Sequence, residues 1–210
     1  MFYKMATIIN YNIKWPKFFY EADNSMFKTF SDNGFKILYY ATQQKLLTGP
    51  IPKLDNSNVL QFTQISELES SIRMDLDSNS SSNSLYFITL DDYHWANDDY
   101  GHNSLGDYFG QKKLLRYLER FFGIFDKNEF DLIIAFSDHG HKMYNELRGN
   151  NGLDFINSDR SQIHLQIRRK NEELVTRNHT LRSIMDIYPF VITYCNFPKP
   201  IDLDGNCLNG

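Results

Sequence analysis

Residues that could bind a metal ion or an anion gather in two short stretches of the chain. The first is "SDHGH", where an apolar run ends at Phe136 and Asp138 and His139 follow. A carboxylate oxygen beside an imidazole nitrogen suits Zn²⁺ or Mn²⁺, and Gly140 permits the turn that would let both side chains reach one ion. The alternative is an ordinary polar loop, in which Asp138 caps a turn and His139 packs against the sheet.

The second stretch is the acidic segment 91–106, which holds two candidate ligand sets in "LDDYHW" and "NDDYGHNSLG". Each set combines aspartate with one histidine, so either could complete a metal site or bind an anionic oxygen. A solvated acidic loop explains the same residues equally well. The first set consists of Asp91, Asp92 and His94, and the second of Asp98 and His102.

Four segments around these stretches have the pattern of β-strands. Three of them are mainly apolar, and the run from Leu132 to Phe136 is apolar throughout, as in a strand covered on both faces. The fourth segment alternates between apolar and polar residues. The predicted strands cover residues 35–41, 85–90, 130–136 and 162–169.

Helical patterns separate these strands. One helix is expected to end before Gly34, which takes the C′ position. Two polar segments, 77–84 and 196–210, are expected to form a surface loop and a loop-like tail. The other predicted helices are 63–76, with Ile65, Leu68, Ile72 and Leu76 on one face; 107–125, with Leu114, Leu115, Leu118, Phe121 and Phe122 on the buried side; and 179–195, broken or bent at Pro189.

The alternation of strands and helices predicts an α/β fold with a mainly parallel sheet and helices on both faces. Both polar stretches directly follow an apolar strand. In such sheets ligands bind beyond the carboxyl ends of the strands. We therefore expect the loops 91–106 and 137–141 to converge at one edge of the sheet.

The overall composition argues against some classes of partner. The chain has 210 residues, enough for one domain, and its net charge of −4 argues against a nucleic-acid partner. No run reaches the roughly 18 apolar residues of a membrane helix, and the N-terminus has no signal-peptide pattern. Cys195 and Cys207 could pair but do not fix the compartment. Secretion or membrane association would therefore require an upstream signal or anchor.

Taken in order, several motifs resemble those of the alkaline phosphatase superfamily, in its sulfatase-like branch. The stretch "DLIIAFSDHGH" resembles the family's "T-x-SDHG" metal motif and is the most specific of them. Before it, "GFKILYY", "FITLDDYHWA" and "LLRYLERFFGIF" resemble the "GY-x-T" strand, the "H-x-P" loop and the "D-x-x-I/V-G-x-L" helix. After it, "RSQIHLQIRRKN", "TLRSIMDIYPFVI" and "DLDGNCL" resemble the "H/R-V-P-L-I-I" strand, the "S-x-x-DI-x-P-T-L" helix and the closing "DG-x-SL".

The resemblance implies a metal-dependent hydrolase of sulfate or phosphate esters, with an anionic ester, for example on a glycan, as substrate. It implies that Asp138 and His139 bind a divalent ion, which would be Ca²⁺, Zn²⁺ or Mn²⁺. The set Asp91, Asp92 and His94 is favoured over Asp98 and His102 as the completing set, because it lies closer to the strand end. The histidine of the chosen set, His94 or His102, would assist the leaving oxygen or hold the anion.

The family's nucleophile has no counterpart in this motif series. In the family this nucleophile is a Thr, a Ser or a Cys converted to formylglycine, and it follows a first strand. Residues 1–24 contain no such arrangement. We therefore expect residues 1–210 to form a single partial sulfatase-like domain, a fragment from which turnover alone is not expected. The alternatives are a non-catalytic remnant that binds metal or a glycan, and an unrelated α/β binding protein.

Overall fold

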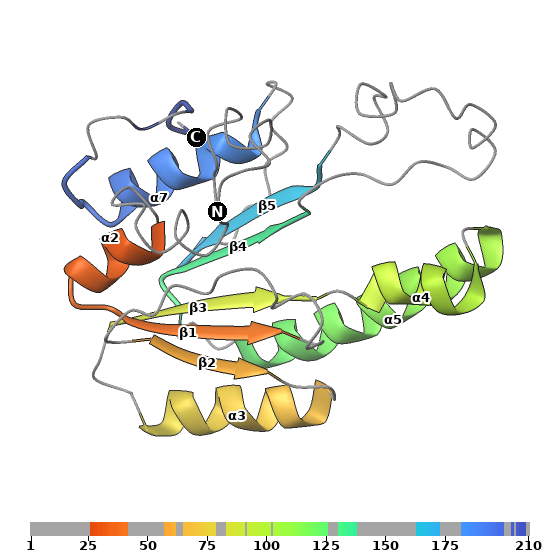
Figure 1. Cartoon of the computed structure of the whole chain (residues 1–210). Helices are drawn as coiled ribbons and strands as arrows, with labels where there is room; N and C mark the ends of the chain where they lie inside the picture. The colour runs from red at the N-terminus through yellow and green to blue at the C-terminus, as the bar shows by residue number, and fades with distance from the viewer. Residues whose placement is uncertain are drawn as a thin grey trace, which may run out of the picture. The chain divides into compact units, whose positions relative to one another are not determined.

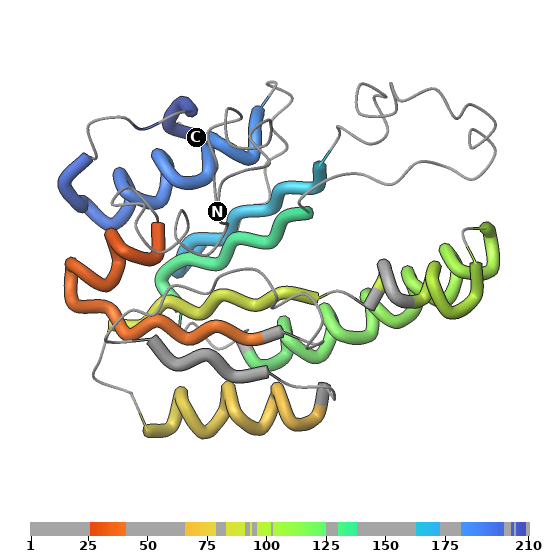
Figure 2. The backbone as a smooth tube through the Cα atoms, viewed as in Figure 1, coloured from red at the N-terminus to blue at the C-terminus, as the bar shows by residue number. Residues whose placement is uncertain are grey.

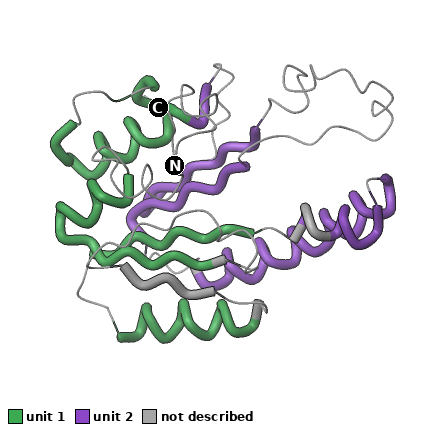
Figure 3. The backbone as a smooth tube through the Cα atoms, viewed as in Figure 1, with its two compact units in different colours: residues 1–91, 185–210 green, residues 92–184 purple. Residues whose placement is uncertain are grey.

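The computed structural model of the chain describes a discontinuous set of residues (Figures 1 and 2). They form two compact units, residues 1–91 with 185–210, and residues 92–184 (Figure 3). Helices and strands occur in both units, so the α/β class is confirmed. The described residues are 26–41, 57–61, 65–78, 83–90, 92–101, 103–125, 130–137, 163–172, 182–199, 203 and 205–208.

The first unit contains a small parallel sheet of three strands. β1 (Lys36–Ala41) lies between β2 (Ser57–Gln61) and β3 (Ser84–Thr89), and both pairings are parallel (Figure 1). In this register Leu38 is opposite Tyr86 of β3. The strands predicted at 35–41 and 85–90 are thus confirmed within one residue at each end, whereas β2 was not predicted.

Side chains of β1 alternate between the two faces of this sheet, as they do in any strand. The ring of Tyr39 lies 6.3 Å from that of Phe27 in helix α2 (Met26–Asp32). The next residue, Tyr40, is fully buried and donates a hydrogen bond to Asp75 of helix α3 (Ile65–Ser78). Helices α2 and α3 therefore contact opposite faces of the sheet.

Helix α3 packs on this sheet through the face that its spacing predicted. Leu68 and Ile72 have no exposed surface. The helix continues through Ser78, and β3 begins at Ser84. The surface loop predicted at 77–84 is therefore shorter than expected, and residues 79–82 of it lie outside the described residues.

Helix α2 ends in a Schellman motif, with Gly34 at C′ as the sequence predicted. Gly34 has a φ of +79°, and its N–H donates to the carbonyl of Ser31 at 2.9 Å. The N–H of Phe35 donates to the carbonyl of Phe30 at 3.0 Å, and the two rings lie 4.9 Å apart. The hydrophobic contact that accompanies this motif is therefore present as well.

Helix α7 (Ile187–Tyr194) ends in the same motif, with Asn196 at C′. Asn196 has a φ of +54°, and the N–H of Phe197 donates to the carbonyl of Ile192 at 3.0 Å. The Phe197 ring lies 5.1 Å from that of Phe30 and 5.5 Å from that of Phe35. The C-terminal ends of α2 and α7 thus share one aromatic cluster.

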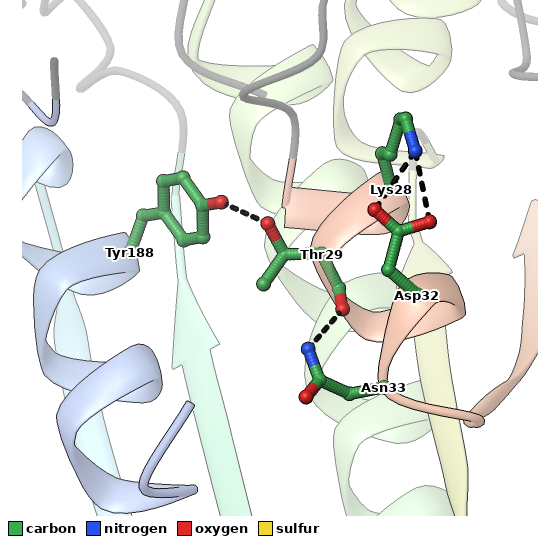
Figure 4. A network of polar contacts seen from close by, with 5 residues as sticks. All are labelled: Lys28, Thr29, Asp32, Asn33 and Tyr188. Carbon is green, nitrogen blue, oxygen red and sulfur yellow. Dashed lines mark hydrogen bonds and ion pairs between the residues drawn. The ribbon is translucent and has the colours of Figure 1, made fainter. Parts of the chain in front are cut away.

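A small polar network joins the same two helices (Figure 4). The hydroxyl oxygens of Thr29 in α2 and Tyr188 in α7 lie 2.5 Å apart. The side-chain amide of Asn33 donates to the Thr29 carbonyl at 2.8 Å, and Lys28 pairs with Asp32 at 2.8 Å. Burial raises the pKa of Tyr188, so the hydroxyl remains a neutral partner for Thr29 at ordinary pH.

The helix predicted over 179–195 is shorter and does not break at Pro189. A 3₁₀ turn, η5 (Ile184–Asp186), leads into α7, and the described residues just before it are not helical. Pro189 lies in the first turn of α7. A backbone N–H there has no partner within the helix, so proline is tolerated.

The C-terminal tail contacts the start of α7. The N–H of Asn206 donates to a carboxylate oxygen of Asp186 at 2.7 Å, and Asp186 is buried. Gly205 has a φ of +92°, and a Cβ there would lie 2.3 Å from the carbonyl oxygen of Met185. Leu208 is also buried. The described residues of the tail contain no helix or strand, but these contacts with Asp186 and Met185 hold their backbone in place.

The second unit combines a helical hairpin with a pair of strands. The hairpin consists of α4 (Asp92–Tyr100) and α5 (Ser104–Phe125). β4 (Leu132–Phe136) pairs antiparallel with β5 (Leu165–Arg169), with Ile134 opposite Ile167. The strands were predicted, but the antiparallel pairing corrects the expectation of a mainly parallel sheet for this part of the chain.

Two further expectations about the hairpin are wrong. The segment 91–106 was predicted as a loop, whereas most of it forms α4 and the first turn of α5. The predicted buried side of α5 included Leu115, which is 59% exposed. Phe121 of the predicted set is buried, and Leu114, Leu118 and Phe122 are half-buried. The other buried side chains of α5 are Tyr117 and Ile124, with Asp107 near the N-terminus.

Candidate metal centre

The predicted ligands Asp138 and His139 follow the end of β4. The strand stops at Phe136, and the Ser137 N–H donates to the carbonyl of His164 at 3.1 Å. The Ser137 hydroxyl accepts a hydrogen bond from the N–H of His164 at 3.0 Å. Asp138 and His139 themselves lie outside the described residues. Ser137, the last described residue of this segment, therefore directly precedes the candidate ligand Asp138.

The other candidate residues lie on or beside α4. Asp92 and His94 belong to this helix, but only their backbone is described, and Asp91 and His102 lie outside the described residues. Asp98 is exposed on the helix. The loop convergence that the sequence predicted falls on residues that are not described.

No family model, curated protein or solved structure matches this chain. Among the side chains that the structure describes, no three His, Cys, Asp or Glu gather as a candidate metal site. Most of the predicted ligands are not among these described side chains. Within the described ranges, no helix is long and apolar enough to cross a membrane. The established class is therefore α/β with a small parallel sheet, and the family relationship stays a prediction.

A buried polar cluster joins α4 to α5 beside these candidate residues. The Tyr93 hydroxyl donates to a carboxylate oxygen of Asp107 at 2.9 Å, and the Asn97 side-chain amide donates to the Tyr93 carbonyl at 3.1 Å. Asn97 is 2% exposed and Asp107 is 9% exposed. Burial, followed by the hydrogen bond that Tyr93 donates to Asp107, raises the pKa of Tyr93 to about 12. Tyr93 thus stays protonated near neutral pH and anchors the hairpin.

Two glycines of α5 allow α4 to pack closely. A Cβ at Gly106 would lie 2.1 Å from the Gly101 carbonyl oxygen and 2.9 Å from the Asn97 side-chain oxygen. A Cβ at Gly110 would lie 2.7 Å from the Tyr93 ring. Sequence reasoning missed this contact, although the spacing of four between the glycines, which puts them on one helix face, was a usable signal.

The turn between the helices is held by an N-cap. The Asn103 side-chain oxygen accepts hydrogen bonds from the N–H groups of Leu105 at 2.9 Å and Gly106 at 3.3 Å. Gly101 has a φ of +89°, which glycine adopts without strain. The side chain of Asn103, together with Gly101 and Gly106, therefore holds the backbone of the turn on both sides of His102.

Replacing Tyr93 by phenylalanine should reduce the loss of stability at alkaline pH. The folded protein holds the Tyr93 proton up to a pKa of about 12, whereas the unfolded chain releases it near pH 10. Stability from this group is thus fully present below pH 10 and is lost as the pH rises toward 12. The difference in free energy of unfolding between wild type and Tyr93→Phe should shrink across this window, as measured by urea titration at several pH values.

The control is Tyr100→Phe, an exposed position of the same helix. It should keep the wild-type pH dependence. The pKa values of Tyr40 and Tyr188 are also raised by burial, but both residues remain in every protein compared. If Tyr93→Phe follows the wild-type curve in parallel from pH 9 to 12, folding does not raise the pKa of Tyr93.

Proposed function

We propose that this chain is part of a sulfatase-like, metal-dependent hydrolase of sulfate or phosphate esters. The observation that carries the proposal is the sequence "SDHG" directly after a strand. The end of β4 at Phe136 supports it. Ser137 is still paired with His164, but the Ser137 hydroxyl takes the place of a backbone carbonyl in one of the two hydrogen bonds. Ligands of α/β proteins bind where strands end, and Asp138 and His139 are the next residues of the chain.

In this proposal Asp138 and His139 would hold the divalent ion. A set with an imidazole nitrogen fits Zn²⁺ or Mn²⁺ better than Ca²⁺, which prefers oxygen ligands. When bound, such an ion polarises the oxygens of the ester. Asp98, or Asp91 with Asp92, would complete the ligand set, and His94 or His102 would give a proton to the leaving oxygen.

The nucleophile lies outside the motif series in this proposal. An alcohol or formylglycine nucleophile is required for the covalent route, and residues 1–24, which precede the motif series, contain no such arrangement. Metal binding and ester hydrolysis are therefore separable properties. We expect this chain to bind the ion and to leave the ester intact.

Metal binding to the chain is the first test. Titration calorimetry with ZnCl₂ and MnCl₂ should show binding that Asp138→Asn and His139→Gln each weaken. Loss of a direct ligand should exceed the roughly 10- to 100-fold loss that removal of an outer-shell partner causes. Unchanged affinity in both variants would refute the site.

Matched controls come from the same pair of strands. Asp131 precedes β4 and pairs with Lys170 at 3.3 Å, with 78% of its side chain exposed, and His164 precedes β5. Asp131→Asn and His164→Gln should bind metal as the wild type does. Hydrolysis of p-nitrophenyl sulfate and p-nitrophenyl phosphate by the metal-loaded chain then separates the candidates. Binding without hydrolysis is expected, and turnover would show that the chain contains its own nucleophile.

A further inference from the structure

Three large apolar side chains lie exposed along one face of α5. Leu105 is 52% exposed, Tyr108 57% and Leu115 59%. Lys112 lies between them, with its Nζ 5.7 Å from the centroid of the Tyr108 ring. The spacings of three, four and three residues put all four side chains on one helix face. We call this set, Leu105, Tyr108, Lys112 and Leu115, the α5 stripe.

The α5 stripe points away from α4. The hairpin packs through Gly106 and Gly110, and Tyr117 and Phe121 extend the buried side of α5. At 3.6 residues per turn, the centre of the stripe lies about 180° around the helix from the centre of that buried side. The partner helix of the hairpin therefore leaves the stripe uncovered, and exposed apolar patches of this kind mark interaction sites.

The α5 stripe is symmetric about position 110 of the chain. Positions 105 and 115 lie five residues to either side of it, and positions 108 and 112 lie two residues to either side. Two α5 helices that pack antiparallel around a two-fold axis near Gly110 would place Leu105 against Leu115 of the second copy. Tyr108 would then face Lys112 of the second copy. A two-fold axis requires this kind of self-complementary surface.

The charges on this face fit the same arrangement. The Lys112 ammonium would meet the ring of Tyr108 in the second copy, a favourable cation–π contact. Glu119 is exposed and lies one turn beyond Leu115 on the same face. The two-fold axis would put its carboxylate near the N-terminus of α5 in the second copy, which attracts negative charge. An anionic lipid surface is disfavoured, because Glu119 and the exposed Asp99 would repel it.

From these observations we propose that the α5 stripe binds a second copy of this chain in an antiparallel, two-fold symmetric dimer. Light scattering and sedimentation of the full chain over a concentration series should show a monomer–dimer equilibrium. Leu115→Glu should weaken the dimer by roughly tenfold or more, because it places an unpaired charge against the apolar Leu105 of the second copy. Met74→Glu is the control, since Met74 is 66% exposed on α3, and should leave the equilibrium unchanged.

Cysteine crosslinking tests the geometry of the dimer. In a Cys195→Ser, Cys207→Ser background, a mixture of Leu105→Cys and Leu115→Cys chains should form a mixed disulfide dimer. Either variant alone should not crosslink, because identical positions lie about 15 Å apart along antiparallel helices centred on Gly110. Efficient crosslinking of Leu105→Cys to itself would overturn the antiparallel arrangement.

A second variant tests the same surface in case Leu115→Glu does not fold. Lys112→Glu changes an exposed side chain, should keep the wild-type circular dichroism spectrum, and should also weaken the dimer. A wild-type chain that remains monomeric at every concentration would overturn the proposal. So would a dimer that both Leu115→Glu and Lys112→Glu leave intact.

Discussion

Gly106→Ala should destabilise the second unit by about 3 kcal/mol, at the upper end of the cost of overpacking. The added Cβ would lie 2.1 Å from the carbonyl oxygen of Gly101 and 3.2 Å from the Cα of Asn97. Both are backbone atoms, so they cannot rotate away as a side chain does. Relief requires α4 to move off α5, which would weaken the hydrogen bond between Tyr93 and Asp107.

The matched control for Gly106→Ala is Gly123→Ala in the same helix. Gly123 is exposed, and a Cβ there meets nothing within 4 Å. Alanine should stabilise that position by roughly 0.5–1 kcal/mol, because glycine is a poor helix former. Urea denaturation followed by circular dichroism measures both variants. Equal effects at the two positions would show that α4 does not pack on α5 at Gly106.

Gly205→Ala is expected to cost about 2–4 kcal/mol, because it combines backbone strain with a clash. The φ of +92° is unfavourable for alanine, and the Cβ would lie 2.3 Å from the carbonyl oxygen of Met185. The tail would have to leave α7, which would break the hydrogen bond from Asn206 to Asp186. Faster proteolysis of the C-terminal residues should accompany the lower unfolding midpoint.

The control for Gly205→Ala is Gly34→Ala, which isolates the contact from the strain. Gly34 also has a positive φ, of +79°, but a Cβ there meets nothing within 4 Å. This variant should lose only the roughly 1–2 kcal/mol that a left-handed conformation costs an ordinary residue. If Gly205→Ala loses no more than Gly34→Ala, the tail does not pack against Met185 in solution.

Local signals in the sequence were sufficient for several elements. The C′ position of Gly34 follows from its place between a helical and an extended segment, since a glycine there avoids the penalty of a positive φ. The apolar spacing of α3 identified Leu68 and Ile72 as core residues, because helix periodicity alone determines which residues share a face. The apolar run of β4 identified that strand for the same kind of local reason.

Elements that depend on a partner far away in the chain were not predicted from the sequence. Helix α4 contains three aspartates and little amphipathic pattern, and it packs against Gly106 and Gly110 of α5. β2 pairs with β1, which supplies backbone hydrogen bonds that no local pattern predicts. Leu115 was expected inside because leucine is usually buried, but its position lies on the side of α5 away from α4.

The sequence by itself determined that the chain forms an α/β fold and that "SDHG" follows a strand, because both depend on residues adjacent in the chain. The tertiary structure alone decided that β5 runs antiparallel to β4, since residues 137–164 are long enough to permit either direction. It also decided that 91–106 is mostly helical and that the Tyr93 hydroxyl of α4 donates a hydrogen bond to Asp107 of α5. These features depend on contacts between residues far apart in the sequence, where burial and hydrogen bonding outweigh local propensity.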